Sequence, residues 1–419
     1  MKSLKKLTVG ALAFALVGVA YADTYNFTGS SAYRKPALQS IEHFLDAGYK
    51  VGYSNGDADQ YGAGSQIYVG TYDATAFGGT TNTPVTIKCT WTGSEGGLYA
   101  VGTPLLVDFI PSSVDLTNSP VKNIADPTKE AVGTFSKEYA QVAMCDTAKA
   151  SSSFKAASAN LTASVPLNLG ICPFKWIVSA GAPAAFTNIT SAQIKQLYSA
   201  GTLKASFFTG NATDSHTVNA IGRDPDSGTR LTAFAESGVG ALAAVTQKEP
   251  CILSGTAMAT DAAQTITSFR TWPVSAIYDV SVNLGNGGYA SGATLAAAMQ
   301  CAVAATGTNV MVAYASTGDA GKAITGGCKE LSYNGVTLGT MSDYNLATNL
   351  ISGNYAFWSI EHMYYNTAAN TANSNIKKFA DAVASYLQLN KATVKITSMK
   401  VKRTGDIGTN ILAGSIPTN

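Results

Sequence analysis

Apolar residues recur along this chain in two periods, one typical of helices and one of strands. In 35–47 they lie on one helical face, and Gly48 follows as a natural stop. In 85–91 they occupy every second position, as in a half-buried strand. Further strands are expected at 25–28, 139–144, 174–179, 218–221 and 309–314, and further helices at 190–201, 227–236, 292–305 and 376–389. Strands that alternate with helices predict an α/β protein with largely parallel sheets.

Local sequence signals support two of these predicted helices, whereas one segment of the chain has no regular pattern. Thr190 and Gln193 form a capping-box sequence at a helix start, and Leu231 and Phe234 are expected to point inward from 227–236. The segment 52–83 is rich in Gly, Ala, Thr, Asn and Asp, which predicts an inserted surface excursion and not a domain. No internal repeat is visible.

The composition narrows the class of protein. Of 419 residues only 13% are charged, the net charge is +2, and 46% are hydrophobic. A nucleic-acid binder would carry a basic patch, and a disordered chain would lack the 15 Phe, 20 Tyr and 4 Trp found here. Forty glycines without a three-residue period exclude collagen. A globular, turn-rich protein of the exported kind remains.

The first 22 residues have the pattern of a secretory signal peptide. Lysines 2, 5 and 6 precede an apolar stretch at 7–19, and Ala20-Tyr21-Ala22 forms a cleavage site, so we expect cleavage before Asp23 and a periplasmic or secreted protein. A short membrane anchor is the alternative, although the stretch is shorter than the roughly 20 residues a spanning helix needs. Nothing later in the chain predicts membrane insertion. Cleavage removes three lysines and leaves 25 bases against 26 acids, a net charge of −1.

Six cysteines follow the signal peptide, and none lies in a C-x-x-C pair typical of a zinc or redox site. Export favours disulfides, and six cysteines allow 15 pairings, of which Cys301 with Cys328 is one candidate. Free buried thiols are the alternative, since a domain of this size does not need cross-links.

Three segments rich in glycine and hydroxyl groups lie between an expected strand and an expected helix: 29–33, 93–97 and 223–229. Each brings backbone N–H groups, hydroxyls and a positive helix end to the carboxyl edge of a sheet. Any one of them is an ordinary helix start, but three in one α/β chain indicate an anion site. Arg223 precedes the Ser-Gly-Thr of the third.

These segments resemble those of the phosphate-binding proteins of bacterial ABC importers, within the type II periplasmic binding protein superfamily. The specific match is 222–229, which carries the family's R-x-x-x-S-G-T motif. Segments 29–36 and 91–98 are similar to its first anion loop and its G-S-G-x-G loop, and 143–146 is similar to a segment ending in Ser-Asp. Weaker similarities at 187–210 and 353–355 extend the resemblance over most of the mature chain.

The resemblance implies a two-lobed α/β fold with the ligand in a cleft. Lobe 1 would comprise 23–165 and 346–419, and lobe 2 would comprise 166–345. The protein would capture inorganic phosphate, or a related oxyanion, for an ABC transporter permease, without a cofactor, a metal or catalysis. The implied ligand-binding residues are Ser31, Ala32, Tyr33, Ser94, Asp146, Arg223, Ser227, Gly228 and Thr229.

Two of these residues would set charge and selectivity. Arg223 would grip two ligand oxygens in a fork, and Asp146 would accept a hydrogen bond from an O–H group of the ligand. A buried acceptor left unmet costs about 1–3 kcal/mol, so sulfate, which has no proton to donate, should bind about tenfold to a hundredfold more weakly than phosphate. Because the mature chain is slightly acidic, the anion must be held by local donors.

The sequence departs from the family pattern at two positions. Glu95 stands where the family has a small residue, so a second carboxylate either points to solvent, weakens phosphate binding, or selects a ligand that carries a cation or extra hydroxyls. Cys145 replaces the serine before Asp146.

Other functions find less support in the residues. The three histidines, His43, His216 and His362, lack metal-ligand spacing, and neither a G-x-S-x-G elbow nor a P-loop is present. A phosphatase on the same fold, and a secreted surface protein that kept the fold without transport, are the alternative functions.

Overall fold

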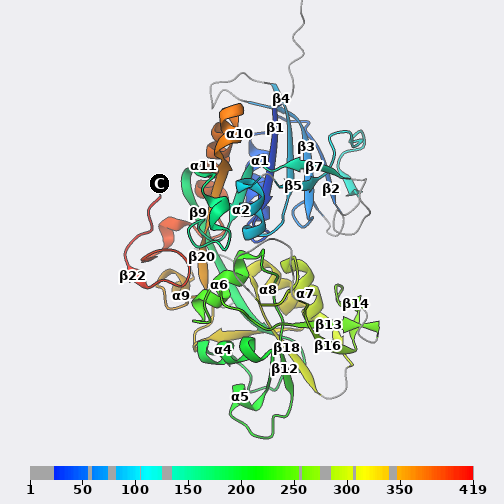
Figure 1. The fold of residues 1–419 in the computed structure, drawn as a ribbon, viewed down its shortest axis with the longest axis vertical. Helices are drawn as coiled ribbons and strands as arrows, with labels where there is room; N and C mark the ends of the chain where they lie inside the picture. Colours follow the sequence, from blue (N-terminus) through cyan, green and yellow to red (C-terminus); the bar gives the residue numbers. More distant parts are fainter. Residues whose placement is uncertain are drawn as a thin grey trace, which may run out of the picture.

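The computed structural model describes residues 23–54, 59–73, 82–103, 105–124, 135–253, 257–273, 285–304, 308–338 and 347–418. Within this part of the chain, two α/β lobes are joined by two long strands (Figure 1). The predicted signal peptide, 1–22, lies outside the described residues. Among the described helices, none is long and apolar enough to cross a bilayer.

Lobe 1 is the upper half of Figure 1. Its strands are β1 (Asp23–Gly29), β2 (Lys50–Ser54), β3 (Ser65–Tyr72), β4 (Thr83–Thr90), β5 (Leu106–Phe109), β6 (Val121–Ile124), β7 (Ser136–Tyr139) and β8 (Val142–Cys145). Its helices are α1 (Arg34–His43), α2 (Ser94–Gly102), α3 (Lys155–Ser158), α10 (Thr367–Ala372) and α11 (Asn375–Tyr386), the last continued by a π-helical turn at Leu387–Lys391.

Lobe 2 is the lower half. Its strands are β10 (Asn188–Ile189), β11 (Thr202–Lys204), β12 (Thr217–Ala220), β13 (Lys248–Ile252), β14 (Ala257–Met258), β15 (Thr265–Ile266), β16 (Ser268–Thr271), β17 (Ala302–Val303), β18 (Asn309–Ser316) and β19 (Lys329–Tyr333). Its helices are α4 (Ser191–Ala200), α5 (Ser206–Thr209), α6 (Gly228–Glu236), α7 (Gly292–Gln300) and α8 (Thr317–Thr325).

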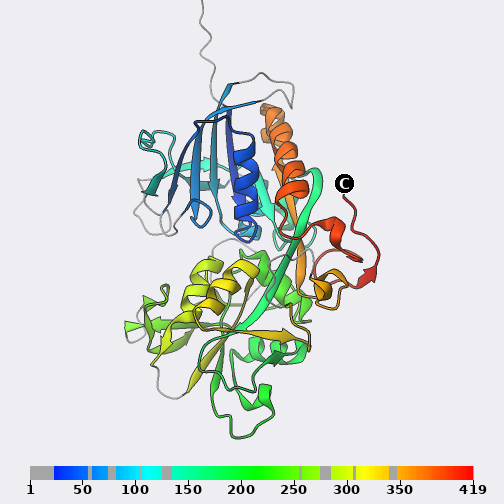
Figure 2. The ribbon, with the colours of Figure 1, turned by 180° about the vertical axis from the view of Figure 1, so that it is seen from behind.

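Two crossing strands, β9 (Leu161–Val178) and β20 (Trp358–Asn366), run between the lobes (Figure 2). They pair with each other, and they make one sheet of both lobes in the order β11-β12-β18-β9-β20-β8-β1-β4-β3-β2-β6. After β20 and α11 the chain follows the joint between the lobes through a 3-10 turn (Ile396–Ser398) and the hairpin β21 (Val401–Arg403) and β22 (Ile411–Ala413). A short helix, α9 (Thr348–Ile351), lies beside this hairpin.

The α/β class predicted from the sequence is confirmed. Parallel pairs lie at the centre of each lobe, β1 with β4 and β8 in lobe 1 and β12 with β18 in lobe 2. Antiparallel strands extend these centres on both sides, and the crossing pair is also antiparallel. Parallel strands place their carboxyl ends at one sheet edge, so the loops that follow β1, β4 and β8 lie together.

Burial explains why β1 forms the centre of lobe 1. Tyr25 and Phe27 are fully buried against α1 and α11, with the Tyr25 ring stacked on Phe379 at 4.4 Å. The other side of the sheet packs on α2 through a separate apolar cluster that includes Leu98 and Ala143. A strand covered on both faces is expected at the middle of an α/β sheet.

The expectation that 85–91 is only half buried is wrong. The apolar and polar positions do alternate, but all residues from Val85 to Thr90 are buried. The small β5–β7 sheet covers the polar face: Lys88 donates to Glu138 at 2.5 Å, and Thr90 donates to the Asp108 carbonyl at 2.8 Å.

The prediction of a surface excursion at 52–83 is also wrong for its described residues. They complete β2 and form β3, which pairs with β4 along its whole length. The buried polar side chains of β3 have partners within the segment: Gln66 donates to the carbonyls of Gln60 and Ala63, at 2.7 and 2.8 Å. Small and polar residues therefore build a sheet strand here because their hydrogen bonds are satisfied locally.

The predicted disulfide between Cys301 and Cys328 is absent. All six cysteines are free and buried. The thiol of Cys301 donates to the Asp261 carbonyl and that of Cys328 to the Met299 carbonyl. The predicted lobe boundaries remain a prediction, since β9 crosses the one at 165 and the one at 345 falls outside the described residues.

Candidate anion-binding site

A narrow pocket lies between the lobes where loops from both meet. Lobe 1 contributes the turn after β1, the start of α2 and the loop after β8, and lobe 2 contributes the start of α6. The lining residues are Ser31, Ala32, Gly93, Ser94, Asp146, Arg223, Ser227, Gly228 and Thr229. Eight of the nine residues predicted from the sequence therefore gather here, although almost 200 positions separate the first from the last.

The turn after β1 is set by Gly29. This glycine has φ +116°, and a Cβ on it would lie 2.0 Å from the Met144 carbonyl oxygen, so only glycine fits. The close approach brings Ser31 and Ala32 next to the loop that carries Asp146. The backbone N–H groups of Ser31 and Ala32 donate no hydrogen bond to any acceptor in the described part of the chain.

Tyr33 is the predicted ligand residue whose side chain the structure places elsewhere. Its ring is buried and its hydroxyl accepts a hydrogen bond from the Thr393 N–H at 3.3 Å. The ring occupies space left by Gly170, where a Cβ would lie 1.9 Å from the hydroxyl. Tyr33 lines a neighbouring hollow of about 230 Å³, together with Cys172 and Phe174.

Glu95 points away from the pocket and into lobe 1. Its carboxylate accepts hydrogen bonds from the hydroxyls of Thr147 and Ser152, at 2.8 and 2.7 Å, and from the Ser153 N–H at 3.0 Å. The residue is fully buried. Burial raises the pKa of Glu95, and these donors partly oppose the rise. The second carboxylate is therefore absent from the pocket wall.

The helix predicted at 227–236 is α6, and Ser227 caps it by accepting from the Arg230 N–H at 3.3 Å. The first two residues of the helix, Gly228 and Thr229, have backbone N–H groups with no acceptor among the described residues. These orphan donors lie at the positive end of the helix. Leu231 and Phe234 are buried, as predicted.

The two lobes contact each other directly at the pocket. The N–H groups of Glu95 and Gly96, at the start of α2, donate to the Asp226 carbonyl at 2.9 and 3.4 Å. Gly228 lies so close to Asp146 that a Cβ on it would be 1.8 Å from the Oδ1 atom. The arrangement is therefore a closed one, with α2 and α6 meeting end to end.

Arg223 is buried and held along one edge. Its Nε donates to the Tyr289 carbonyl and its Nη2 to the Ala290 carbonyl, both at 2.9 Å. Its Nη1 has no partner in the part of the chain that the structure describes. An anchored guanidinium with one free edge can grip an oxyanion without first losing much freedom.

Asp146 lies opposite and is also buried. Its Oδ1 accepts from the Ser94 hydroxyl at 2.6 Å, and its Oδ2 accepts from the Thr229 hydroxyl at 3.2 Å. Burial raises the pKa of Asp146, while both hydroxyls and Arg223 oppose the rise. Cys145 points away: its thiol donates to the Thr147 carbonyl at 2.9 Å.

Several buried charges behind the pocket carried no signal in the sequence. Arg230 is 2% exposed, and its Nη1 donates to the carbonyls of Arg223 and Asn286 at 2.8 and 3.0 Å, which fixes the loop before α6. Burial raises the pKa of Asp224 to about 6 and that of Asp226 well above its usual range, although Arg223 and Arg230 favour both carboxylates. An arginine one residue after a helix-start motif is usually solvent-exposed, so only the fold reveals this role.

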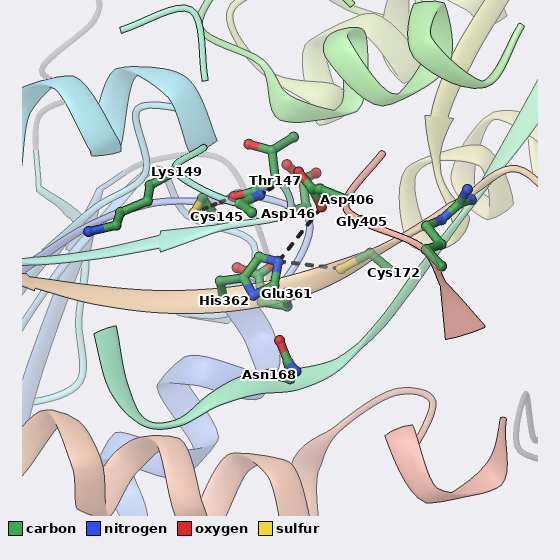
Figure 3. Close-up of polar contacts among 12 residues, drawn as sticks. Cys145, Asp146, Thr147, Lys149, Asn168, Cys172, Glu361, His362, Gly405 and Asp406 are labelled. Atoms are coloured by element: carbon green, nitrogen blue, oxygen red, sulfur yellow. Dashed lines mark hydrogen bonds and ion pairs between the residues drawn. The ribbon is translucent and has the colours of Figure 1, made fainter. Parts of the chain in front are cut away.

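Glu361 lies on the crossing strand β20 (Figure 3) and contacts the turn after β1. Its Oε2 accepts from the Ser30 hydroxyl at 3.1 Å and from the Cys172 thiol at 3.3 Å. Burial, and to a lesser degree the nearby Asp146, raises the pKa of Glu361 well above its usual range. The Glu361 carboxyl group thus ties the turn after β1 to the crossing strands β20 and β9.

In the part of the chain that the structure describes, the pocket lining offers backbone N–H groups, hydroxyls, one guanidinium and one carboxyl group, and it contains no histidine or cysteine. Among the described residues, no group of three or more His, Cys, Asp or Glu side chains is arranged to hold a metal ion.

Comparisons with known proteins find similarity in structure only. No protein-family model matches the sequence, and no curated protein matches it. A putative phosphate ABC transporter substrate-binding protein with bound phosphate from Clostridium perfringens aligns with 12% identity and a TM-score of 0.45, over 89% of this chain and 100% of that one. An ABC-type phosphate transport receptor from Vibrio cholerae aligns with 12% identity and a TM-score of 0.42, over 87% and 96%. A phosphate-binding protein from Stenotrophomonas maltophilia aligns with 14% identity and a TM-score of 0.38, over 86% and 83%. At such values we infer the ligand from the pocket itself.

Proposed function

We propose that this chain is an exported solute-binding protein that captures inorganic phosphate, or a similar tetrahedral oxyanion, between its lobes for an ABC transporter permease. One observation supports this most directly. Four N–H groups and one arginine nitrogen without partners among the described residues belong to the lining of a single pocket: the N–H groups of Ser31, Ala32, Gly228 and Thr229, and Nη1 of Arg223. A tetrahedral anion supplies acceptors in several directions, which such a set of donors requires.

The charges of the pocket favour a protonated anion. Arg223 and Asp146 are the only residues of formal charge in its lining within the described part of the chain, and their formal charges cancel. The hydroxyls of Ser94 and Thr229 donate to Asp146, so each must rotate before it can donate to a ligand. A ligand with its own O–H replaces the donors that Asp146 loses, and phosphate brings such a proton whereas sulfate does not.

The number of donors is sufficient for useful affinity. Each hydrogen bond to a charged group contributes about 1.5–3 kcal/mol, and micromolar binding needs about 8 kcal/mol. Four or five such bonds, less the free energy lost in ordering the ligand and closing the lobes, reach that range.

Titration calorimetry of the purified protein with phosphate and with sulfate tests the proposal. We expect phosphate to bind at micromolar concentration or below and sulfate at least about tenfold more weakly, because Asp146 rejects an anion without a proton. Asp146→Asn should reduce this preference, since an amide can also donate. Failure of both anions to bind below millimolar concentration would contradict the proposal.

The same samples separate the other functions. Turnover of a phosphomonoester that disappears on changing a pocket residue would indicate a phosphatase. Tight association with cells or filaments, without anion binding, would indicate a surface protein. No observation among the described residues favours either one.

A further inference from the structure

The C-terminal hairpin, defined as β21, β22 and their loop at 404–410, contacts both halves of the candidate site. It is held together by antiparallel pairing from Val401–Ala413 to Arg403–Ile411. Its tip carries Asp406 and Gly408, which contact different lobes. A segment with separate contacts to two lobes restrains their separation.

The contact with lobe 1 involves the loop that carries Asp146. The Oδ2 atom of Asp406 accepts a hydrogen bond from the Ala148 N–H at 2.8 Å, two residues beyond Asp146. Its Oδ1 lies 3.9 Å from Nε2 of His362, on the crossing strand. Figure 3 shows Asp406 beside Asp146 and Thr147, with a dashed line to the histidine. Its hydrogen bonds and His362 lower the pKa of Asp406 despite burial, so the carboxylate is charged.

The contact with lobe 2 involves α6, the helix that begins with Ser227-Gly228-Thr229. Glu236, its last residue, accepts from the Gly408 N–H at 2.6 Å and from Nη2 of Arg403 at 3.0 Å. Gly408 packs directly on the helix end, since a Cβ on it would lie 2.9 Å from the Ala235 Cβ. The side chains of Glu236 and Arg403 are 6% and 2% exposed, so solvent screens this ion pair little.

Arg403 also connects the hairpin to the joint between the lobes. It donates to the carbonyls of Ala356 and Trp358, at 2.8 and 2.9 Å, and its guanidinium lies 4.2 Å from the Trp358 ring centroid. Trp358 is the first residue of β20. The hairpin is therefore fixed at the joint and reaches from there to each lobe.

We propose that this hairpin is a clasp that holds the Asp146 loop and α6 together in the closed arrangement, with Asp406 and Glu236 as positioning residues. The inference rests on the proposed function for its ligand, but the clasp itself acts without one. Because apparent affinity is the intrinsic affinity multiplied by the fraction of closed molecules, loosening the clasp weakens binding without touching the pocket.

The test measures the distance between the lobes with and without ligand. Lys50→Cys in lobe 1 and Lys195→Cys in lobe 2 provide exposed labelling sites, while the six native cysteines are buried. In this background we compare Asp406→Ala, Asp406→Asn, Glu236→Ala and Glu236→Gln. The control is Asp108→Ala, which removes a carboxylate paired with Lys137 inside lobe 1. Label-to-label distances are measured by pulsed electron resonance, and phosphate binding by calorimetry and stopped flow.

We expect the two alanine variants to show longer distances without ligand and to bind phosphate about tenfold or more weakly, mainly through faster dissociation. The Asp406→Asn and Glu236→Gln variants keep a hydrogen-bond acceptor. Their distances and phosphate affinities should therefore lie between those of the alanine variants and those of the wild type. If an alanine variant fails to fold, the Asp406→Asn and Glu236→Gln variants test the clasp instead, because they keep the shape of the side chain and remove only its charge.

Unchanged ligand-free distances in all four variants would overturn the clasp, even if phosphate binds normally. If the hairpin variants show longer ligand-free distances but the wild type binds no phosphate, the clasp is supported and the proposed function is contradicted. If the hairpin variants change the ligand-free distance no more than the control Asp108→Ala does, the clasp is also contradicted.

Discussion

Arg223 and Asp146 illustrate how single residues set what the pocket accepts. Each is at least 96% buried, and each is tied to neighbours before any ligand arrives. The arginine is anchored by two carbonyls, which leaves one edge of its guanidinium for the anion. The aspartate is held by two hydroxyls, which a ligand must release. Affinity and selectivity are therefore separate properties, each tested at its own residue.

Replacing Arg223 tests the affinity. We expect Arg223→Ala to weaken phosphate binding by at least about a hundredfold, since it removes a charge-assisted pair worth roughly 3 kcal/mol or more. Arg223→Lys should recover only part, because an ammonium cannot form the fork. Calorimetry checks both, with Arg270→Ala as the control that removes an exposed positive charge outside the pocket lining. Near-normal affinity in Arg223→Ala would contradict the site.

Asp224 predicts a pH dependence of stability. Its pKa is about 6 in the folded protein because burial disfavours the carboxylate, against about 3.9 when unfolded. Between about pH 4 and pH 6 the folded state thus holds the proton more tightly, so this residue's contribution to stability falls as the pH rises through that window. The loss is at most about 3 kcal/mol, at 1.4 kcal/mol per pKa unit.

Urea unfolding of the wild type and of Asp224→Asn at pH 4.5, 5.5 and 7 measures that contribution. The difference between the two proteins should change in favour of the variant as the pH rises. Asp261→Asn, at an exposed aspartate, should follow the wild type. Parallel pH profiles for wild type and Asp224→Asn would refute the assignment.

At the scale of elements, the sequence predicted those whose ends and faces carry local signals. The helix α4 has the predicted capping box between Thr190 and Gln193 and ends at Gly201 in the left-handed conformation. The strand β3 was missed because its composition is that of a loop, and its polar side chains find partners only in the folded chain. Strand β9 was predicted as six residues and has 18, because its length reflects pairing with β20 and β18.

Thr190→Ala should lower the free energy of unfolding by about 1 kcal/mol, because it removes one half of the capping box. Denaturant unfolding measures this, and Thr190→Ser should remain near the wild type since it keeps the hydroxyl. Phosphate affinity should not change, because Thr190 is outside the pocket lining. Equal stability of the alanine and serine variants would show that the cap contributes nothing.

The start of α6 offers a test of closure that does not remove a polar group. Gly228→Ala would place a methyl group 1.8 Å from the Asp146 Oδ1 atom, so the lobes cannot meet as they do here. We expect phosphate affinity to fall at least about tenfold while the melting temperature is kept, since alanine favours a helix by about 1 kcal/mol. Gly318→Ala, in α8 with no atom within 4 Å, is the matched control. Unchanged affinity in Gly228→Ala would show that closure at this contact is not required.

For the whole molecule, local motifs predicted which residues would gather at the pocket, and tertiary packing set what they do there. The helix-start segments carried that information because an anion site of this kind is built from backbone ends. The orientation of Glu95 and Tyr33, and the roles of Arg230, Glu361 and the C-terminal hairpin, depend on contacts between distant segments. No periodicity or motif encodes such contacts.

The buried thiols provide a measurement on the whole molecule. Burial raises the pKa of all six cysteines, to about 11 for Cys301 and Cys328, and the thiolate is the reactive form. A disulfide exchange reagent at pH 7.5 should therefore label none of them rapidly in the native protein and all six in denaturant. The exposed Lys195→Cys variant is the positive control. Rapid labelling of a native thiol would show that its surroundings open.

The single sheet that passes through both lobes limits how they can move. β9 and β20 remain hydrogen-bonded across the joint, and their pairing shifts register on each side of His362. Such bulges bend and twist a ribbon without breaking its ladder. The joint should thus resist twisting elastically, unlike a free linker. The lobes should therefore open over a narrow range of angles and return to the closed arrangement. Hydrogen exchange in 358–366 should be equally slow with the lobes apart or together, which distinguishes bending from local unfolding.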